Sequence, residues 1–240
     1  MTIPPLPLAN LWTAFVDSNG IGKIIVLVQV AMSVLIWSFM GARRADLKRI
    51  MHASDEFRRF FSEADAILGY YFQKPLSHNP LIVVYMAASR RLVRELERVG
   101  GIVAGVGDTT GRTLSTASMA LVKGVAEETL STESLKLENG MGALAAGTTI
   151  APFLGLLGTV WGVLDAFQVM GAKGAVNLSE VAPSLSTAML TTVVGLVVAI
   201  PSVVGYNLLV NRIRRITISL DGFTDEYLAR ALAEFGGDKR

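Results

Sequence analysis

The stretch from Ala151 to Gly162 reads APFLGLLGTVWG and lies inside an uncharged run from Met141 to Leu164. As a helix, such a run is long enough to cross the hydrocarbon core of a bilayer, which is about 30 Å thick and takes about 20 residues. Small residues recur along it at three- and four-residue steps and so share one helix face: Gly155, Gly158, Thr159, Gly162 and Ala166. Membrane helices pack closely through such faces. The run therefore predicts a transmembrane helix with a tight packing seam.

Two further apolar runs accompany it. The chain carries no charged residue from Ile24 to Ala42, and none from Val181 to Asn211. The last run has thirty-one residues. At about 1.5 Å per residue it would measure roughly 46 Å as a helix, which exceeds the hydrocarbon core. We therefore expect transmembrane helices at 24–42, 141–170 and 181–211, and we expect the last of them to project into the cytoplasm.

The composition also indicates a membrane protein. Of the 240 residues, 51% are hydrophobic and 18% are charged, and the mean hydropathy is +0.48. A soluble domain of this length is far less apolar, so the excess faces lipid. The net charge of +2 does not indicate the basic face of a nucleic-acid-binding protein. Because the chain has no cysteine, disulfides, thiolate metal sites and cysteine nucleophiles are excluded. We expect neither a metal nor another cofactor.

The basic residues indicate which segments face the cytoplasm, since Lys and Arg gather on cytoplasmic flanks. Of the 22, fourteen lie between Gly41 and Gly140 and six follow Asn211, while the other two are Lys23 and Lys173. We therefore expect an external N-terminal segment 1–23, a helical cytoplasmic segment 43–140, a short periplasmic loop 171–180 and a cytoplasmic tail 212–240. No basic residue precedes Lys23, so the basic region of a cleaved signal peptide is missing and the first apolar run is expected to stay as an anchor.

Hydroxyl groups lie among the small residues at mid-membrane depth. Thr159 belongs to the second run, and Thr187, Thr191 and Thr192 belong to the third, where Gly195 is part of a similar small-residue stripe. A threonine in a helix can satisfy its hydroxyl on a carbonyl three or four residues back, so each one alone fits a simple packing seam. Together they also fit a polar path. Thr192 lies about 100° round the helix from Thr191, so we do not expect the two to face the same neighbour.

Asp165 is the one acidic residue at the second apolar run, and a carboxylate inside a membrane is a functional candidate by default. It precedes Gly171 by six residues, so it lies near the external end of the predicted helix, where water or headgroups can solvate it. Two interpretations stay open, an interfacial residue and a proton relay. In the third run, Pro183 lies in the first turn, where it is tolerated, and Pro201 is expected to kink the helix.

Five strings carry a likeness to a known family. They are residues 151–162, Val181-Ala182-Pro183, residues 195–197, residues 199–201 and Tyr206-Asn207. These strings resemble the two signature spans of the MotA/TolQ/ExbB family of inner-membrane motor proteins almost position for position, most strongly across residues 141–227. Within them we expect these residues to be structural: Pro152, Trp161, Pro183, Pro201, Tyr206 and Asn207.

The resemblance implies an all-α protein of the bacterial inner membrane with three transmembrane helices and long helices that extend into the cytoplasm. It implies a homopentamer around a central pore, with a periplasmic N-terminus and a cytoplasmic C-terminus. A TolR/ExbD-like partner would place single transmembrane helices with an essential aspartate in that pore, and a TolA/TonB-like protein is a further candidate partner. Thr159 and Thr192 match the family's pore threonines, which would face this aspartate. The chain would then be the stator of a motor that uses the proton gradient to energise the cell envelope.

One position departs from the family pattern. TolQ and ExbB proteins usually carry a glutamate where this chain has Thr187. The proton step then rests on the partner's aspartate alone, or Asp165 takes part in it. The departure also leaves the branch open between Tol-type division and envelope maintenance, Exb-type energising of outer-membrane import, and another member of the superfamily.

The alternative function is a stand-alone ion or solute channel or transporter. Small-residue stripes fit a transporter, but three spans without an internal repeat make a poor one. An enzyme is the least favoured class, because the predicted spans hold no cysteine or histidine that would supply a nucleophile, a base or a metal site.

Overall fold

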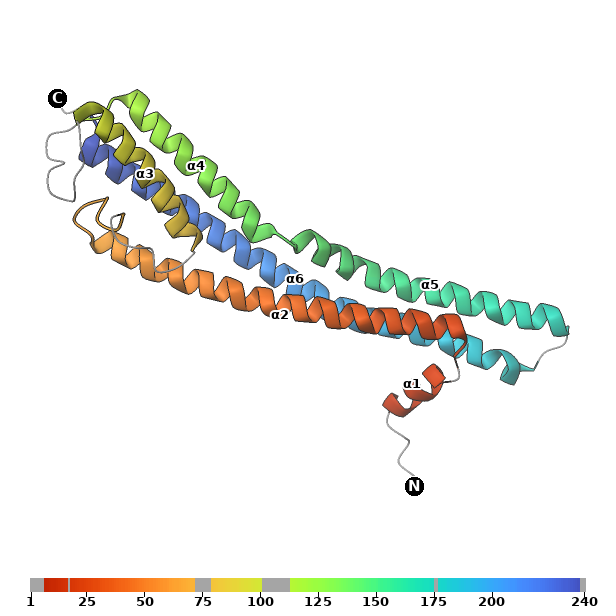
Figure 1. Cartoon of the computed structure of the whole chain (residues 1–240). Coiled ribbons are helices and arrows are strands. Elements are labelled where there is room, and N and C mark those ends of the chain that lie inside the picture. The colour runs from red at the N-terminus through yellow and green to blue at the C-terminus, as the bar shows by residue number, and fades with distance from the viewer. Residues whose placement is uncertain (1–6, 17, 72–78, 101–112, 175–176, 238–240) are drawn as a thin grey trace, which may run out of the picture. The chain divides into compact units, whose positions relative to one another are not determined.

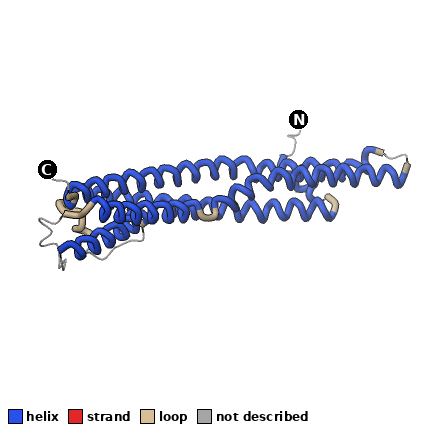
Figure 2. The backbone as a smooth tube through the Cα atoms, turned by 90° about the horizontal axis from the view of Figure 1, so that it is seen from above, coloured by secondary structure: helices blue, strands red, loops and turns tan. Residues whose placement is uncertain are grey.

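The structure is a computed structural model that describes all residues except 1–6, 17, 72–78, 101–112, 175–176 and 238–240. Every regular element among the described residues is a helix (Figure 2), apart from one isolated bridge between Leu114 and Gly236. The helices in chain order are α1 (Pro7–Val16), α2 (Gly20–Glu63), α3 (Pro80–Gly100), α4 (Thr116–Glu138), α5 (Met141–Lys173) and α6 (Leu178–Phe235), as labelled in Figure 1.

The contacts divide the chain into two compact units. The first unit is Met1–Arg43 with Gly140–Leu209, and the second unit is Arg44–Asn139 with Val210–Arg240. The first unit contains α1, α5 and parts of α2 and α6, whereas the second contains α3, α4 and the remainder of α2 and α6.

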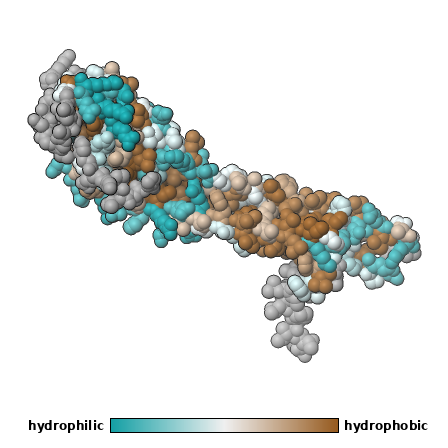
Figure 3. Space-filling view, viewed as in Figure 1, coloured by the Kyte–Doolittle hydropathy of each residue, from teal (hydrophilic) through white to brown (hydrophobic). Residues whose placement is uncertain are grey.

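Three helical stretches are long and apolar enough to cross a membrane, namely α2, the run Thr116–Lys173 that ends with α5, and α6. In each, only 28% of the most apolar 18-residue stretch is buried. Figure 3 shows the exposed apolar surface in brown. Soluble monomers rarely expose apolar patches of this extent, whereas lipid covers them in a membrane. For the described residues, the predicted all-helical class with three helices able to cross a membrane is confirmed.

The helices extend beyond the predicted spans 24–42, 141–170 and 181–211, whose limits in the membrane stay a prediction. The helix α2 begins at Gly20, within the segment predicted to be external, and α5 and α6 occupy part of the predicted loop 171–180. Gly174, at φ 75°, ends α5, and its N–H donates to the Met170 carbonyl. Periodicity does not locate such ends, because the termination depends on one residue that adopts a left-handed φ.

Gly140 separates α4 from α5. Its φ of 81° is in the left-handed region, and a Cβ there would lie 2.7 Å from the Phe39 ring of α2. Any other residue at this position would therefore be strained and would collide with Phe39. The position explains why the helical pattern restarts at Met141.

The second unit is held by a cluster of buried aromatic rings from α2, α3 and α6. The rings of Phe61 and Phe223 have centroids 5.0 Å apart, and those of Phe57 and Tyr85 are 5.4 Å apart, both edge to face. This geometry is the preferred one for aromatic pairs. The Tyr85 hydroxyl donates to the Ile67 carbonyl at 2.8 Å, so the buried phenol is satisfied.

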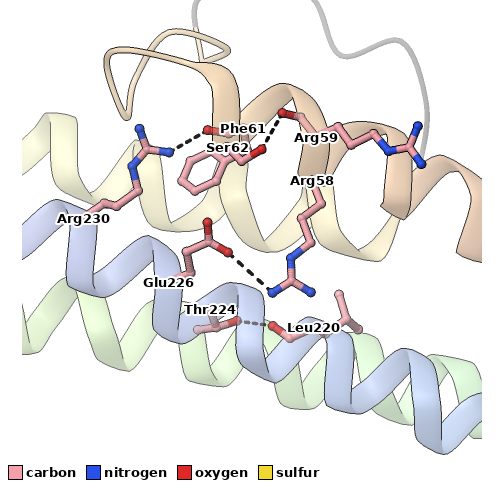
Figure 4. Close-up of polar contacts among 8 residues, drawn as sticks. All are labelled: Arg58, Arg59, Phe61, Ser62, Leu220, Thr224, Glu226 and Arg230. Atoms are coloured by element: carbon pink, nitrogen blue, oxygen red, sulfur yellow. Dashed lines mark hydrogen bonds and ion pairs between the residues drawn. The ribbon is translucent and has the colours of Figure 1, made fainter.

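Arg230 of α6 closes the end of α2 (Figure 4). Its guanidinium donates to the carbonyls of Phe61 and Ala64, each at 2.6 Å, and lies 4.7 Å from the Phe61 ring centroid. The last carbonyls of a helix have no partner within the helix, so an arginine that bonds them stabilises the terminus. Arg58 and Glu226 add an ion pair at 3.5 Å between the same two helices.

We predict that the second unit loses stability in alkali. Burial raises the pKa of Tyr85 from 10.0 to about 12, and it also raises the pKa of Tyr227. In the unfolded chain both phenols ionise near pH 10, so the folded state holds more protons above that pH. The contribution of the two buried phenols to the stability of the second unit is therefore complete below pH 10 and falls as the pH rises from 10 towards 12. Helicity measured by circular dichroism against pH should show this loss, and the double variant Tyr85→Phe, Tyr227→Phe should lose less. Identical profiles would contradict the assignment.

Candidate functional site

The helices α5 and α6 pack through glycine in the first unit. A Cβ added to Gly158 would overlap the Thr191 side chain, and a Cβ added to Gly162 would lie 2.7 Å from both the Ser184 carbonyl and the Ala188 Cβ. Real Cβ atoms essentially never come within 3.0 Å of such atoms. The two backbones therefore approach to a distance that only glycine permits, and the seam lies within one chain.

Gly155 and Gly195 extend this seam towards α2. A Cβ on Gly155 would lie 3.0 Å from the Thr191 carbonyl, and one on Gly195 would lie 2.8 Å from the Ala151 carbonyl and 2.9 Å from the Gln29 side-chain nitrogen. The structure thus brings together all four glycines that the sequence suggests for helix packing. It also places Gln29, which sequence reasoning missed, at the junction of the three helices.

The hydroxyls of Thr159 on α5 and Thr192 on α6 form a hydrogen bond with each other, and either can donate. Both side chains are half-buried. The Thr159 hydroxyl also lies 3.2 Å from the carbonyl oxygens of both Gly155 and Ala188. The Thr192 hydroxyl lies 3.1 Å from the Gly155 carbonyl oxygen and 3.4 Å from that of Ala188. We call these two residues the threonine pair.

The threonine pair can serve a third group either as donor or as acceptor. Each hydroxyl has one proton and two lone pairs. Each proton can point to the other hydroxyl, to the Gly155 carbonyl or to the Ala188 carbonyl, so rotation changes which group each hydroxyl donates to and which of its lone pairs are in use. A carboxyl group that gains and loses a proton needs both kinds of partner.

Thr191 is fully buried, and its hydroxyl donates to the Ala188 carbonyl at 2.8 Å. It also lies 3.4 Å from the Gly155 carbonyl, which Thr192 contacts as well. The expectation that residues 191 and 192 do not face the same neighbour is therefore wrong. At Gly155 the α5 backbone lies so close to α6 that the hydroxyls of both Thr191 and Thr192 reach the Gly155 carbonyl.

Thr187 lies apart from the threonine pair. Its side chain is buried, and its hydroxyl donates to the Pro183 carbonyl in its own helix at 2.9 Å. Its methyl group packs against Gly22 of α2, where a Cβ would overlap it. At the position where the resemblance implies a glutamate, the chain therefore has a buried threonine whose hydroxyl is bonded within its own helix.

Asp165 belongs to a separate cluster that joins α5, α6 and the start of α2. Its Oδ2 accepts hydrogen bonds from the Ser184 hydroxyl at 2.6 Å and from the Asn19 side-chain amide at 3.2 Å. Asn19 in turn accepts from the Gly22 N–H at 2.7 Å, which is an N-cap for α2. Sequence reasoning missed Asn19, although an asparagine just before an apolar run is an N-cap signal. Among the described residues, no hydrogen bond leads from this cluster to the threonine pair.

The residues that the family resemblance marks as structural are spread along the two helices. Pro152 and Trp161 lie in α5, and Pro183 and Pro201 lie inside α6, which continues as a helix from Leu178 to Phe235. Tyr206 is half-buried and Asn207 is exposed. A kink at Pro201 stays a prediction. Within the described part of the chain, no three metal-ligating residues gather.

Comparisons with known proteins agree on one family. The family model described as the MotA/TolQ/ExbB proton channel family matches residues 85–221. The biopolymer transport protein ExbB of Xanthomonas campestris pv. campestris is 30% identical over 205 residues, which is 82% of this chain and 78% of that protein. The Tol-Pal system protein TolQ of Pseudomonas aeruginosa is 26% identical over 224 residues, which is 92% of this chain and 91% of that protein. ExbB of Salmonella typhimurium is 46% identical over 74 residues, 31% of this chain and 30% of that protein.

We predict that Gly162→Ala destabilises the first unit by about 1–3 kcal/mol, because the added methyl group meets the Ser184 backbone and cannot be accommodated by a rotamer change. Gly142→Ala is the matched control on the same helix, where no atom of the described residues lies within 4 Å of the added Cβ. Thermal unfolding in detergent or lipid measures both changes. Equal stability of the two variants would contradict the glycine seam.

Proposed function

The chain belongs to the MotA/TolQ/ExbB proton channel family, and from this premise we propose that it is the scaffold subunit of a motor driven by the proton motive force. As a multi-pass protein of the inner membrane, it would convert proton flow into movement of a partner and so transmit energy to the envelope. The relatives named ExbB and TolQ support such an energy-transducing role over an enzymatic one.

The observation that carries the proposal is the threonine pair. Thr159 and Thr192 are polar groups on a surface that is otherwise apolar, with Leu156 56%, Val160 60% and Leu196 45% exposed nearby in sequence. Lipid offers such a surface no hydrogen bond, so a polar partner for this half-buried pair would have to come from another membrane segment. A single transmembrane helix of a TolR/ExbD-like protein, with an aspartate at this depth, has the required chemistry.

In the proposed assembly, five copies surround a pore and each contributes its threonine pair. The aspartate of the partner helix would accept a hydrogen bond from the pair when it is ionised and donate one when it is protonated. Proton transfer would then change which pair the aspartate prefers, and the partner would move relative to the ring. A TolA/TonB-like protein is the further partner through which the force would reach the outer membrane.

Because Thr187 replaces the usual glutamate, the ring would have no acid of its own at that position. We propose that the proton step rests on the partner's aspartate. The arrangement of Asp165 supports this, since its Oδ2 is bonded to Asn19 and Ser184 rather than to the threonine pair. Its proposed role is to hold the start of α2 against the ends of α5 and α6.

The distribution of basic residues supports a periplasmic N-terminus and a cytoplasmic C-terminus. In this orientation the second unit lies in the cytoplasm, and the connection between α5 and α6, where Lys173 and Glu180 form an ion pair, lies on the periplasmic side.

We predict that Thr159→Val and Thr192→Val each lower proton-driven activity on the order of 10- to 100-fold, because valine keeps the shape but removes a hydrogen bond to a charged group. Thr149→Val is the matched control, since Thr149 is exposed and its hydroxyl bonds the Ala145 carbonyl of its own helix. Activity is measured as uncoupler-sensitive envelope function in cells, with the amount of assembled complex checked on native gels. Full activity of both pair variants would rule out the proposed site.

We predict that Asp165→Asn retains proton-driven activity, because the asparagine oxygen still accepts the hydrogen bond from Ser184. Asp165→Ala removes the acceptor and should cost about 1–3 kcal/mol of stability, since two donors lose their partner. The same assay and thermal unfolding check these outcomes. A loss of activity in Asp165→Asn without a loss of stability would instead make Asp165 a proton relay.

A further inference from the structure

Gln29 of α2 is a fully buried amide inside the first unit, with 0% of its surface exposed. Its side-chain nitrogen donates to the Thr191 carbonyl of α6 at 3.1 Å and lies 3.5 Å from the Ala151 carbonyl of α5. Two acceptor oxygens thus face the same end of the amide, so the donor nitrogen must be at that end. One side chain of α2 therefore links the backbones of the other two helices.

Both packing glycines nearest to α2 make room for this amide. A Cβ on Gly195 would lie 2.9 Å from the Gln29 nitrogen, and one on Gly155 would lie 3.5 Å from it. At both positions the glycine serves two purposes, since it also permits the close approach of α5 and α6. A larger residue at Gly195 would push the amide away from the carbonyls it bonds.

Stability does not account for a glutamine at this position. In the described part of the chain, the Gln29 Oε1 is buried and has no hydrogen-bond donor. An unpaired oxygen in apolar surroundings costs free energy, and an unbranched apolar side chain of similar length would avoid that cost. What the amide supplies and an apolar side chain cannot is the pair of directional bonds to α5 and α6.

We propose that Gln29 is a positioning residue, which holds α5 and α6 in the register that forms the threonine pair. The carbonyl it bonds on α6 belongs to Thr191, the residue next to Thr192. The carbonyl it reaches on α5 belongs to Ala151, one helical turn before Gly155, whose own carbonyl both hydroxyls of the pair contact. A sliding of one helix along the other would break the Gln29 bonds and separate the pair. The importance of this register for energy transduction rests on the proposed function. The hydrogen bonds of Gln29 to α5 and α6 do not depend on that function.

The test uses the full chain in lipid bilayers, labelled with ¹³C-threonine and observed by solid-state NMR. The Cβ signals of Thr159 and Thr192 are assigned from the Thr→Val variants. Gln29→Met removes both donors at nearly constant length, and we expect both signals to shift while the signal of Thr224, in the second unit, stays unchanged. We also expect the thermal stability of Gln29→Met to equal or exceed that of the wild type.

Gln29→Glu provides a rescue. A carboxyl group in this buried site is neutral and has one O–H donor, so it can bond one of the two carbonyls. The threonine signals should therefore return part of the way to their wild-type positions. Ser33→Ala is the matched control on α2, because the Ser33 hydroxyl bonds the Val30 carbonyl of its own helix. It should leave the threonine signals in place.

Three results would overturn the proposal. The first is an unchanged pair of threonine signals in Gln29→Met. The second is an equal shift in Ser33→Ala, which would indicate a general response to the loss of a polar group in α2. The third is a clear loss of stability in Gln29→Met, which would make the amide a stabilising group. Proton-driven activity of the wild-type protein tests the proposed function separately from the role of Gln29. If the wild-type protein showed no such activity, the proposed function would be refuted, and the NMR result would still decide whether Gln29 is a positioning residue.

Discussion

The close approach of α5 and α6 is the constraint on which the rest of the first unit depends. Gly158 and Gly162 leave no space for a Cβ, so the two backbones can meet. At this distance a hydroxyl on one helix reaches a carbonyl on the other, as Thr159 does at Ala188 and Thr192 does at Gly155. Directional hydrogen bonds therefore replace the hydrophobic effect, which supplies little association energy between helices surrounded by lipid.

The same constraint explains why polar groups are tolerated in this unit. A buried polar group in a membrane is costly unless it is bonded, and the hydroxyls here are bonded to carbonyls or to each other. The threonine pair differs from Thr187 and Thr191 because it is half-buried, so it can still serve a group outside the chain. Gln29 differs in another way, because it leaves its oxygen without a donor and yet links three helices. Both exceptions lie beside Gly155, since a Cβ added there would lie 3.5 Å from the Gln29 nitrogen and both hydroxyls of the pair contact the Gly155 carbonyl.

Sequence reasoning found the three apolar runs, the glycine stripe and the threonines, because each of these is a periodic or compositional signal. It could not find the Asp165 cluster, since Asn19, Asp165 and Ser184 meet only when three helices are in place. Gln29 was hidden for a similar reason. It carries no charge and lies in an apolar run, and nothing local shows that it faces the other helices rather than lipid. Hydropathy also does not locate the helix ends, because Gly174 stops α5 through its φ rather than through a change in hydropathy.

In the proposed motor, several copies of the chain form a ring around a single-span partner, and native mass spectrometry of the protein extracted gently from its own membranes would detect that ring. One experiment gives the number of copies and the mass of anything bound. We expect five copies with a small, single-span protein attached. A monomer or dimer that retains no partner under the same conditions would contradict this expectation, and would indicate a chain that works alone.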